Sequence, residues 1–275
     1  MGDSAKKILF VNAEMCPYLP ETRIAKLCRE LPQGIQDRNK EIRAFMPRYG
    51  CINERKNQLH EVIRLSGMNI IIGDVDRPLI IKVASISAAR IQVYFIDNED
   101  YFRRKQIYRD EDGNFFADNG ERAIFFARGV LETVKKLRWA PDIIHCSGWI
   151  SHVLPLYLKK AYKDDPIFSN SKIVLSLFDD TPEELLSPGF AKTILYGGIK
   201  PRDIASLPDQ PSGTELAKLA AQYADGIILG SPDIPAGIAE YCGTLGVPVL
   251  PYEADSYEDG SYMDRYNAFY DDLLK

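Results

Sequence analysis

The sequence predicts a single α/β domain built on a doubly wound, mostly parallel sheet. Short apolar segments alternate with amphipathic segments of helical period along most of the 275 residues. Strands covered on both faces read as continuous apolar runs, and two parallel strands need a helical crossover between them. A composition of 45% hydrophobic and 27% charged residues also suits a well-cored globular domain.

The first strand–helix–strand unit is expected near the amino terminus. Residues 8–13 form an apolar strand, and residues 22–36 carry apolar side chains at the spacing of an amphipathic helix. A second strand, 42–46, ends at Pro47. Such a unit with its right-handed crossover starts a Rossmann-like sheet.

Residues 60–96 interrupt this alternation, because three strand-like segments follow one another without a helix. They predict a β-hairpin insertion that leads into a core strand. The long polar loop 97–119 comes next, and loops of this length in compact domains are usually functional. The remaining expected elements are the strands 70–73, 79–86, 91–96, 142–145, 172–177, 226–229 and 247–251, the helices 120–137, 149–162, 214–223, 232–242 and 263–274, and short helices with loops over 179–211.

We expect one domain over residues 1–252, followed by an acidic linker and a carboxyl-terminal helix over 253–275. This last helix carries Tyr266, Phe269 and Tyr270 on one face. An apolar stripe on a helix needs a surface to cover it, so the helix is expected to pack back onto the domain.

Charge and composition exclude several classes of function. A net charge of −5 and a pI near 5.4 provide no basic footprint for nucleic acid. The chain lacks the run of roughly 18 apolar residues that a membrane-spanning helix requires. Its five cysteines include no Cys-x-x-Cys pair, so we expect no metal site and reduced thiols in a cytoplasmic protein.

An ordered series of short motifs resembles the amino-terminal domain of the glycogen and starch synthases of glycosyltransferase family 5. The resemblance implies one half of a GT-B fold, in which two Rossmann-like halves close over a nucleotide sugar. It further implies that this half is the acceptor side. The matching segments are residues 8–14, 47–50, 93–98, 110–113, 118–126 and 141–149, with weaker similarity at 224–225 and 231–232.

The loop after the first strand departs from the family's pattern. Where the family has Lys-Thr-Gly-Gly-Leu facing the donor phosphates, this chain has Pro20, Glu21, Thr22, Arg23 and Ile24. Glycines let the backbone approach a phosphate, and a lysine neutralises it. Glu21 would repel a phosphate and Pro20 has no N–H to donate, while Arg23 is displaced by three residues from the lysine position.

Two further motifs are altered, and the family's donor-binding half has no counterpart in these residues. Ser147 and Gly148 stand at the family's His-Asp positions, and Phe178 and Asp179 stand where a His-Asn pair is expected. Such groups stabilise charge that develops in the transition state, usually the largest catalytic contribution. We therefore predict no catalytic residue, no cofactor and no glucosyl transfer by the chain alone.

A candidate glucan site remains at the carboxyl ends of the strands, where open α/β sheets bind ligands. Each member also has a structural alternative, such as a helix cap for Asp118 and Asn119 or a loop-capping role for Glu14. Aromatic residues of the 97–119 loop either stack on sugar rings or pin that loop to the core. The acidic pair Asp179–Asp180 is predicted to be a solvated turn, and His145 a core residue. The candidate residues are Glu14, Tyr94, Asp118, Asn119, Arg122 and Trp149.

Three functions follow as hypotheses. The first is a catalytically inactive, glycogen-synthase-like domain that binds an α-glucan or an enzyme of glycogen metabolism. The second is the acceptor half of a split ADP- or UDP-glucose-dependent glucosyltransferase. The third is a purely structural oligomerisation domain. The oligomeric state and the partner are not specified by the sequence.

Overall fold

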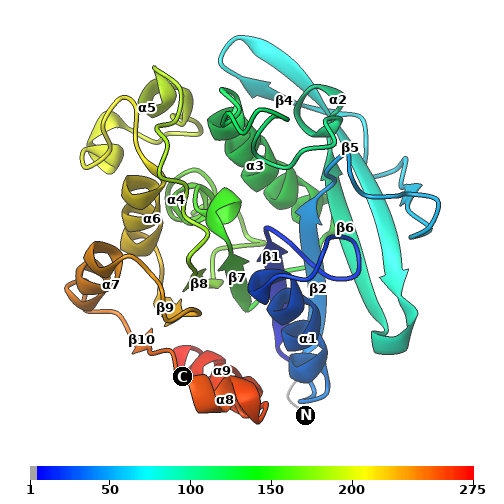
Figure 1. Cartoon of the computed structure of the whole chain (residues 1–275), viewed down its shortest axis with the longest axis vertical. Coiled ribbons are helices and arrows are strands. Elements are labelled where there is room, and N and C mark those ends of the chain that lie inside the picture. Colours follow the sequence, from blue (N-terminus) through cyan, green and yellow to red (C-terminus); the bar gives the residue numbers. More distant parts are fainter. Residues whose placement is uncertain (1–4) are drawn as a thin grey trace.

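A computed structural model describes residues 5–275, which form one twisted sheet with flanking helices (Figure 1). The strand order is β10-β9-β8-β7-β1-β2-β6-β5-β3, and β4 pairs with β5. Residues 1–4 of the expected 1–252 domain lie outside the described residues. The strands are β1 (Lys7–Asn12), β2 (Glu41–Pro47), β3 (His60–Glu61), β4 (Met68–Ile72), β5 (Val75–Ile86), β6 (Ile91–Asp97), β7 (Ile143–Ser147), β8 (Lys172–Leu177), β9 (Gly226–Leu229) and β10 (Val249–Leu250).

Two groups of helices cover the sheet. Helices α1 and α9 contact each other and lie on the face that carries His145, while α3, α4 and α6 pack together on the opposite face. The helices are α1 (Arg23–Gln36), α2 (Glu99–Phe102), α3 (Asn119–Leu137), α4 (Leu154–Lys160), α5 (Phe190–Thr193), α6 (Gly213–Gln222), α7 (Ala236–Gly243), α8 (Ala254–Glu258) and α9 (Tyr262–Leu273), with 3₁₀ turns at Ser87–Ala89, Trp149–Ser151 and Pro201–Ile204.

The central strands are parallel, and the predicted doubly wound architecture is confirmed. β1 pairs in parallel with β2 on one side and with β7 on the other. From β1 the chain first builds outward through β2 and β6, and then returns to β7 and builds outward through β8 and β9. The strand order therefore reverses between β1 and β7, which is the position where such sheets bind ligands.

The antiparallel part of the sheet comes from the predicted hairpin insertion. β4 and β5 form the hairpin, with Gly73 at φ +59° in the turn, and β5 continues as an antiparallel neighbour of β6. The hairpin therefore extends the main sheet outward, and it leaves Ile71 and Val75 exposed.

One predicted helix is interrupted. Residues 149–162 were expected to form a continuous helix, but Trp149–Ser151 is a 3₁₀ turn and α4 begins at Leu154. Pro155 lies in the first turn of α4. Proline lacks an N–H and clashes with the preceding turn, so it is tolerated at a helix start and breaks a helix that runs through it.

The carboxyl-terminal segment lies against the sheet. The Tyr270 hydroxyl is 2.6 Å from Nδ1 of His145, and Tyr266 packs its ring 5.9 Å from the same imidazole. His145 is fully buried, and this burial lowers its pKa to about 3. Part of the segment expected to be a linker is helix α8.

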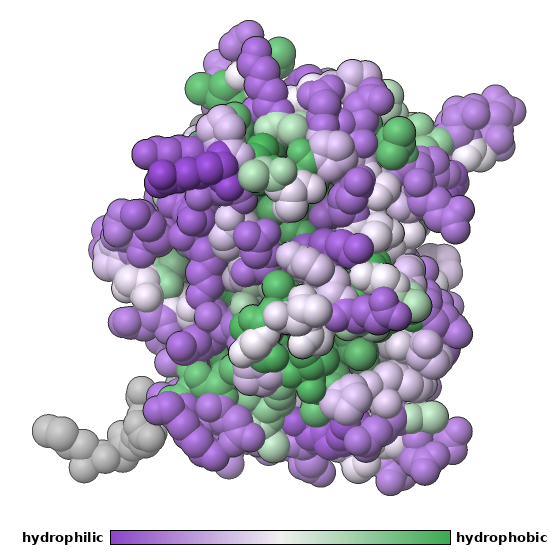
Figure 2. Space-filling model, turned by 90° about the vertical axis from the view of Figure 1, so that its left-hand side faces the viewer, coloured by the Kyte–Doolittle hydropathy of each residue, from purple (hydrophilic) through white to green (hydrophobic). Residues whose placement is uncertain are grey.

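An apolar region is visible on the face that Figure 2 presents, at the height of β10 and the two last helices in Figure 1. Val249 and Leu250 of β10 are half-buried there. β10 is the end of the strand order on this side, so its outer backbone edge is unpaired within residues 5–275.

Candidate functional site

A crevice forms where β1, β7 and β8 end. Glu14 follows β1, Gly148 follows β7, and Asp180 follows β8. The Ala13 N–H donates to the Ser147 carbonyl oxygen over 2.8 Å, which holds the first two strand ends together. Three parallel strands thus present their carboxyl ends at one edge, at the point where the strand order reverses.

The turn after β7 requires a glycine. Gly148 has φ +88°, a conformation that side chains rarely adopt, and a Cβ there would lie 2.4 Å from the Ala13 Cβ. The same Cβ would lie 3.0 Å from Oδ2 of Asp180. That oxygen accepts a hydrogen bond of 2.7 Å from the Trp149 N–H. The Asp180 carboxylate therefore lies next to position 148, where a side chain would otherwise project.

Asp180 is the main site residue that the sequence interpretation missed. It was assigned to a solvated turn, but it is half-buried, and burial raises its pKa to about 7. Its Oδ1 atom is buried without a hydrogen-bond partner among residues 5–275. The available sequence signal was an acidic residue shortly after an apolar strand of the parallel sheet, because ligands bind at the carboxyl ends of such strands.

Glu14 is held beside this turn by the start of α1. The Thr22 hydroxyl donates to Oε2 of Glu14 over 2.6 Å and accepts from the Ala25 N–H over 3.0 Å, so it also caps the helix. Burial raises the pKa of Glu14, and the Thr22 hydrogen bond opposes that rise. The Glu14 charge in turn adds to the burial effect on Asp180. Two carboxyl groups that are easier to protonate than usual therefore share the crevice.

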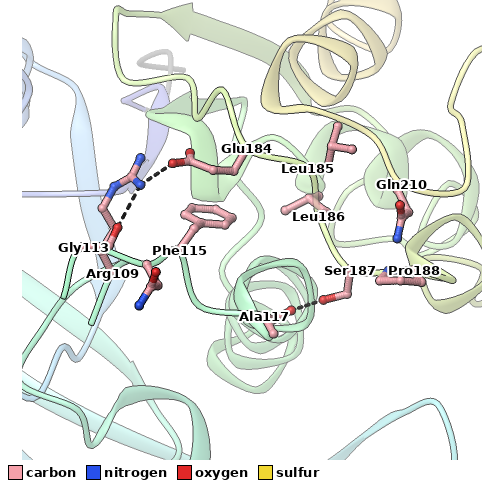
Figure 3. A pocket seen from close by; sticks show the side chains of 11 residues that line it. Arg109, Gly113, Phe115, Ala117, Glu184, Leu185, Leu186, Ser187, Pro188 and Gln210 are labelled. Carbon is pink, nitrogen blue, oxygen red and sulfur yellow. Dashed lines mark hydrogen bonds and ion pairs between the residues drawn. The ribbon is translucent and has the colours of Figure 1, made fainter. Parts of the chain in front are cut away.

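Two neighbouring cavities lie beside the crevice and share part of their lining. A cavity of about 310 Å³ is lined by Tyr108, Phe115, Trp149 and the acidic residues that follow β8. A neighbouring cavity of about 540 Å³ shares Arg109, Phe115 and Glu184 with it (Figure 3). We call the two together the mouth groove. It lies between residues 108–117 and residues 179–188.

Polar contacts hold the two walls of the mouth groove together. Figure 3 shows the Arg109 guanidinium directed at Glu184, with which it forms an ion pair, and the Phe115 ring beside this pair. Ser187 donates a hydrogen bond to the Ala117 carbonyl. Behind the groove, the buried Trp149 packs its ring 4.9 Å from Tyr108 and 6.0 Å from Phe115.

Three predicted site residues contact the 103–117 loop from the start of α3, where Asn119 and Arg122 are buried and Asp118 is half-buried. Arg122 donates to the Ile107 carbonyl over 2.6 Å and to Oδ1 of Asn119 over 2.5 Å, and Asn119 donates to the Tyr108 carbonyl over 2.8 Å. Burial lowers the pKa of Arg122. Asp118 is the N-cap residue of α3, but its side chain pairs with Arg104. These residues position the groove wall without lining the groove.

Tyr94 does not lie at the strand ends, which corrects its expected placement. It stacks on Phe45 at 4.8 Å, and its hydroxyl donates to Gln92 over 2.7 Å. Arg43, which also lies over the Trp139 ring, contacts the Tyr94 ring. Gln92 precedes Tyr94 on the same face of β6, so the hydroxyl points toward the amino end of the strand, away from the mouth groove.

The altered family positions have separate locations. Pro20 and Glu21 are exposed, and Arg23 donates to the Ser231 hydroxyl over 3.0 Å. Ser147 is buried on the His145 face, 3.5 Å from Nε2 of His145. Phe178 is buried against Gly230, while the neighbouring Asp179 is exposed and lines the smaller cavity.

Within residues 5–275, no cluster of three or more His, Cys, Asp or Glu side chains could hold a metal ion. No helix in this part of the chain is long and apolar enough to cross a membrane. All five cysteines are free thiols.

The sheet and its crevice have the architecture of one Rossmann-like half of the GT-B fold. The catalytic domain of starch synthase IV from Arabidopsis thaliana, solved bound to ADP and acarbose, superposes with a TM-score of 0.69 at 17% identity. This match covers 92% of the chain and 52% of that structure.

The chain belongs to the family of starch synthase catalytic domains, whose family model matches residues 7–245. A glycogen synthase from Chlorobium limicola is 40% identical over 172 residues, covering 62% of the chain and 35% of the relative. A glycogen synthase from Chlorobaculum parvum is 32% identical over 234 residues, covering 85% and 47% respectively. The chain thus spans between a third and half of the length of these relatives.

Proposed function

We propose that this chain binds an α-glucan in the mouth groove. The observation that carries the proposal is the groove's lining. Tyr108 and Phe115 offer ring faces, and the carboxyl groups of Asp180 and Glu184 lie beside them. Sugar-binding sites combine apolar rings with a few fixed polar groups, and a carboxyl group accepts hydrogen bonds from sugar hydroxyls.

The charges around the mouth groove favour a neutral ligand over a nucleotide sugar. The smaller cavity is lined by four acidic residues, Asp179, Asp180, Glu183 and Glu184, while its one cation, Arg109, is already paired with Glu184. Like charges at short range repel, so the phosphates of a nucleotide sugar would bind poorly. A maltooligosaccharide carries no charge.

We propose further that these 275 residues do not transfer glucose on their own. Glu21 and Pro20 stand where the resemblance places a phosphate-binding loop, and Gly148 stands where it places an aspartate. Removing one preorganised group that stabilises transition-state charge costs about 3 kcal/mol, and several are replaced here.

The free thiols support a reducing compartment such as the cytoplasm.

Titration with maltoheptaose and with ADP-glucose, followed by calorimetry and by NMR of labelled protein, tests the binding proposal. Maltoheptaose should bind and shift signals around Phe115 and Asp180. Phe115→Ala and Asp180→Asn should each weaken it about fivefold or more, because the first removes an aromatic ring and the second replaces one of two carboxyl oxygens by an amide nitrogen that cannot accept a hydrogen bond. Tyr241→Ala, which removes a half-buried tyrosine outside the groove, is the matched control. Saturable binding of ADP-glucose without any maltoheptaose binding would contradict the proposal.

The alternative proposal is an acceptor half whose donor half comes from another polypeptide. It is motivated by the match of residues 7–245 to the starch synthase catalytic domain family. Glycogen would be incubated with ADP-[14C]glucose and this chain, with and without cell extract. Incorporation that needs both the chain and the extract would favour this alternative. Self-association with neither glucan binding nor incorporation would leave the oligomerisation hypothesis.

A further inference from the structure

Arg128 is a buried cation without a matching anion. It lies on α3, its residue is 7% exposed, and its Nη1 donates to the backbone carbonyl of Ile71 in the hairpin. Its Nε is buried without a hydrogen-bond partner among residues 5–275, and no carboxylate in that range forms an ion pair with it. Buried charges in proteins are normally paired, because the desolvation of an unpaired charge is costly.

Arg122 provides an internal comparison six residues earlier on the same helix. That guanidinium is surrounded by four aromatic rings, of Tyr49, Phe102, Tyr108 and Phe116, and its Nη1 has two oxygen acceptors. Cation–π contacts can compensate a buried charge in this way. Arg128 has one such ring, that of Tyr196 at 3.7 Å. The charge of Arg128 is therefore compensated by fewer aromatic rings and fewer oxygen acceptors than the charge of Arg122.

The exposed part of Arg128 borders a cavity of about 710 Å³. We call this cavity the hairpin groove, because β4 and the hairpin turn form one wall and the end of α5 with the following residues forms the other. Figure 1 shows α5 and the hairpin on either side of α3. The lining consists of Asn69, Ile71, Gly73, Asp74, Arg128, Lys192, Thr193, Leu195 and Tyr196.

We propose that the hairpin groove binds the phosphoryl group of a small phosphorylated sugar or nucleotide. Arg128 and Lys192 supply two cations against the single carboxylate of Asp74, and a guanidinium or ammonium group donates charge-assisted hydrogen bonds to phosphate oxygens. The groove is larger than a bare phosphate needs, and the Tyr196 ring and Leu195 offer an apolar surface to an attached ring. The hairpin groove shares no lining residue with the mouth groove, so this proposal is independent of glucan binding.

Calorimetric titration with inorganic phosphate, glucose 1-phosphate and AMP tests the proposal. Comparison of the three affinities shows whether the phosphoryl group binds best alone, on a sugar or on a nucleotide. At least one of the three should bind with a 1:1 stoichiometry. Arg128→Met, which keeps the length of the side chain and removes the charge, should weaken binding about tenfold or more, as expected for charge-assisted hydrogen bonds. Lys192→Ala should weaken it about threefold, and Lys200→Ala, an exposed lysine outside the groove, should leave it unchanged. Maltoheptaose affinity should be unchanged in all three variants.

Thermal unfolding adds a readout that does not depend on calorimetric sensitivity. Phosphate should raise the melting temperature of the wild type more than that of Arg128→Met. If Arg128→Met does not fold, Lys192→Glu replaces it, because Lys192 is exposed and its reversal should abolish the phosphate effect. Failure of all three compounds to bind, or binding unaffected by Arg128→Met and Lys192→Glu, would overturn the proposal. So would a loss of stability in Asp74→Asn without any phosphate effect, since the hairpin carboxylate would then be the partner of Arg128.

Discussion

At the scale of single residues, the turn after β7 shows how one backbone conformation excludes a side chain. Gly148 combines a positive φ with a close approach to Ala13, so no other residue fits without a shift of the strand ends. The carboxylate nearest to this position is that of Asp180, which follows the neighbouring strand β8. Restoring the aspartate that the family resemblance implies at 148 would therefore place two carboxylates together.

Gly148→Ala should destabilise the protein by about 1–3 kcal/mol, because it adds both backbone strain and a Cβ contact. Gly148→Asp should cost at least as much and should not create transferase activity. Urea unfolding measures the free energy of both variants. Gly198→Ala is the matched control, since Gly198 has φ +90° with nothing within 4 Å of its Cβ position. Equal losses for Gly148→Ala and Gly198→Ala would show that the Ala13 contact is unimportant.

Asp180 should make stability depend on pH. Its pKa is raised from 3.8 to about 7 in the folded protein, so the folded state binds its proton more tightly than the unfolded state does. This contribution to stability is fully present below about pH 4 and is lost as the pH rises to about 7. A difference of one in pKa corresponds to about 1.4 kcal/mol.

Asp180→Asn keeps an oxygen acceptor for the Trp149 N–H and removes the titrating group. The variant should gain stability relative to the wild type as the pH rises from 4 to 8, measured as the difference between their unfolding free energies at each pH. Burial lowers the pKa of His145 and of a second buried histidine, His152, to about 3, which also makes stability depend on pH, but both residues are present in the two proteins and their contribution cancels in the difference. A difference that does not change with pH would show that Asp180 ionises normally.

At the scale of secondary-structure elements, the last helix completes the core on one face of the sheet. Tyr262, Tyr266, Phe269 and Tyr270 of α9 are buried, and the Tyr270 hydroxyl is the hydrogen-bond partner of Nδ1 of the buried His145. Met263 lies against Gly34 of α1, where a Cβ would be 2.3 Å from its sulfur. Close approach of the two helices thus depends on a glycine.

Truncation after Gly260 should lower the melting temperature sharply and reduce solubility. Each large apolar side chain that loses its burial costs about 1.5–3 kcal/mol, and the sum for α9 approaches the 5–15 kcal/mol of a typical domain. Circular dichroism during heating measures the effect. Asp272→Ala, on the exposed side of the same helix, should be nearly neutral. A truncated protein with an unchanged melting temperature would show that α9 contributes little to the core.

At the scale of the whole molecule, the crevice carries Ser147 and Gly148 at positions where the family resemblance implies a histidine and an aspartate. The purified 275-residue chain should show no glucosyl transfer above a no-enzyme control with ADP-glucose or UDP-glucose and glycogen. A full-length family 5 glycogen synthase assayed in parallel is the positive control. Elongation of glycogen by the purified chain alone would refute this expectation.

The sequence by itself determined the strand–helix alternation, the hairpin insertion and the family. These follow from local periodicity and from the order of short motifs, both of which are properties of neighbouring residues. It also identified the crevice as a region, because residues that follow parallel strands share one edge of the sheet. Pro155 was a local signal of the broken helix after β7 that the periodicity alone did not reveal.

Only the tertiary structure decided which side chains meet at the crevice. In the structure, Tyr94 contacts Arg43 and Arg122 supports a loop from beneath. Asp180, which the sequence predicts to lie in a solvated turn, has its carboxylate beside Gly148. The burial of Arg128 without a carboxylate partner likewise depends on contacts with β4 and Tyr196, which lie far from it in sequence. Burial, charge pairing and the choice among hydrogen-bond partners are set by contacts between distant segments, and no local pattern encodes them.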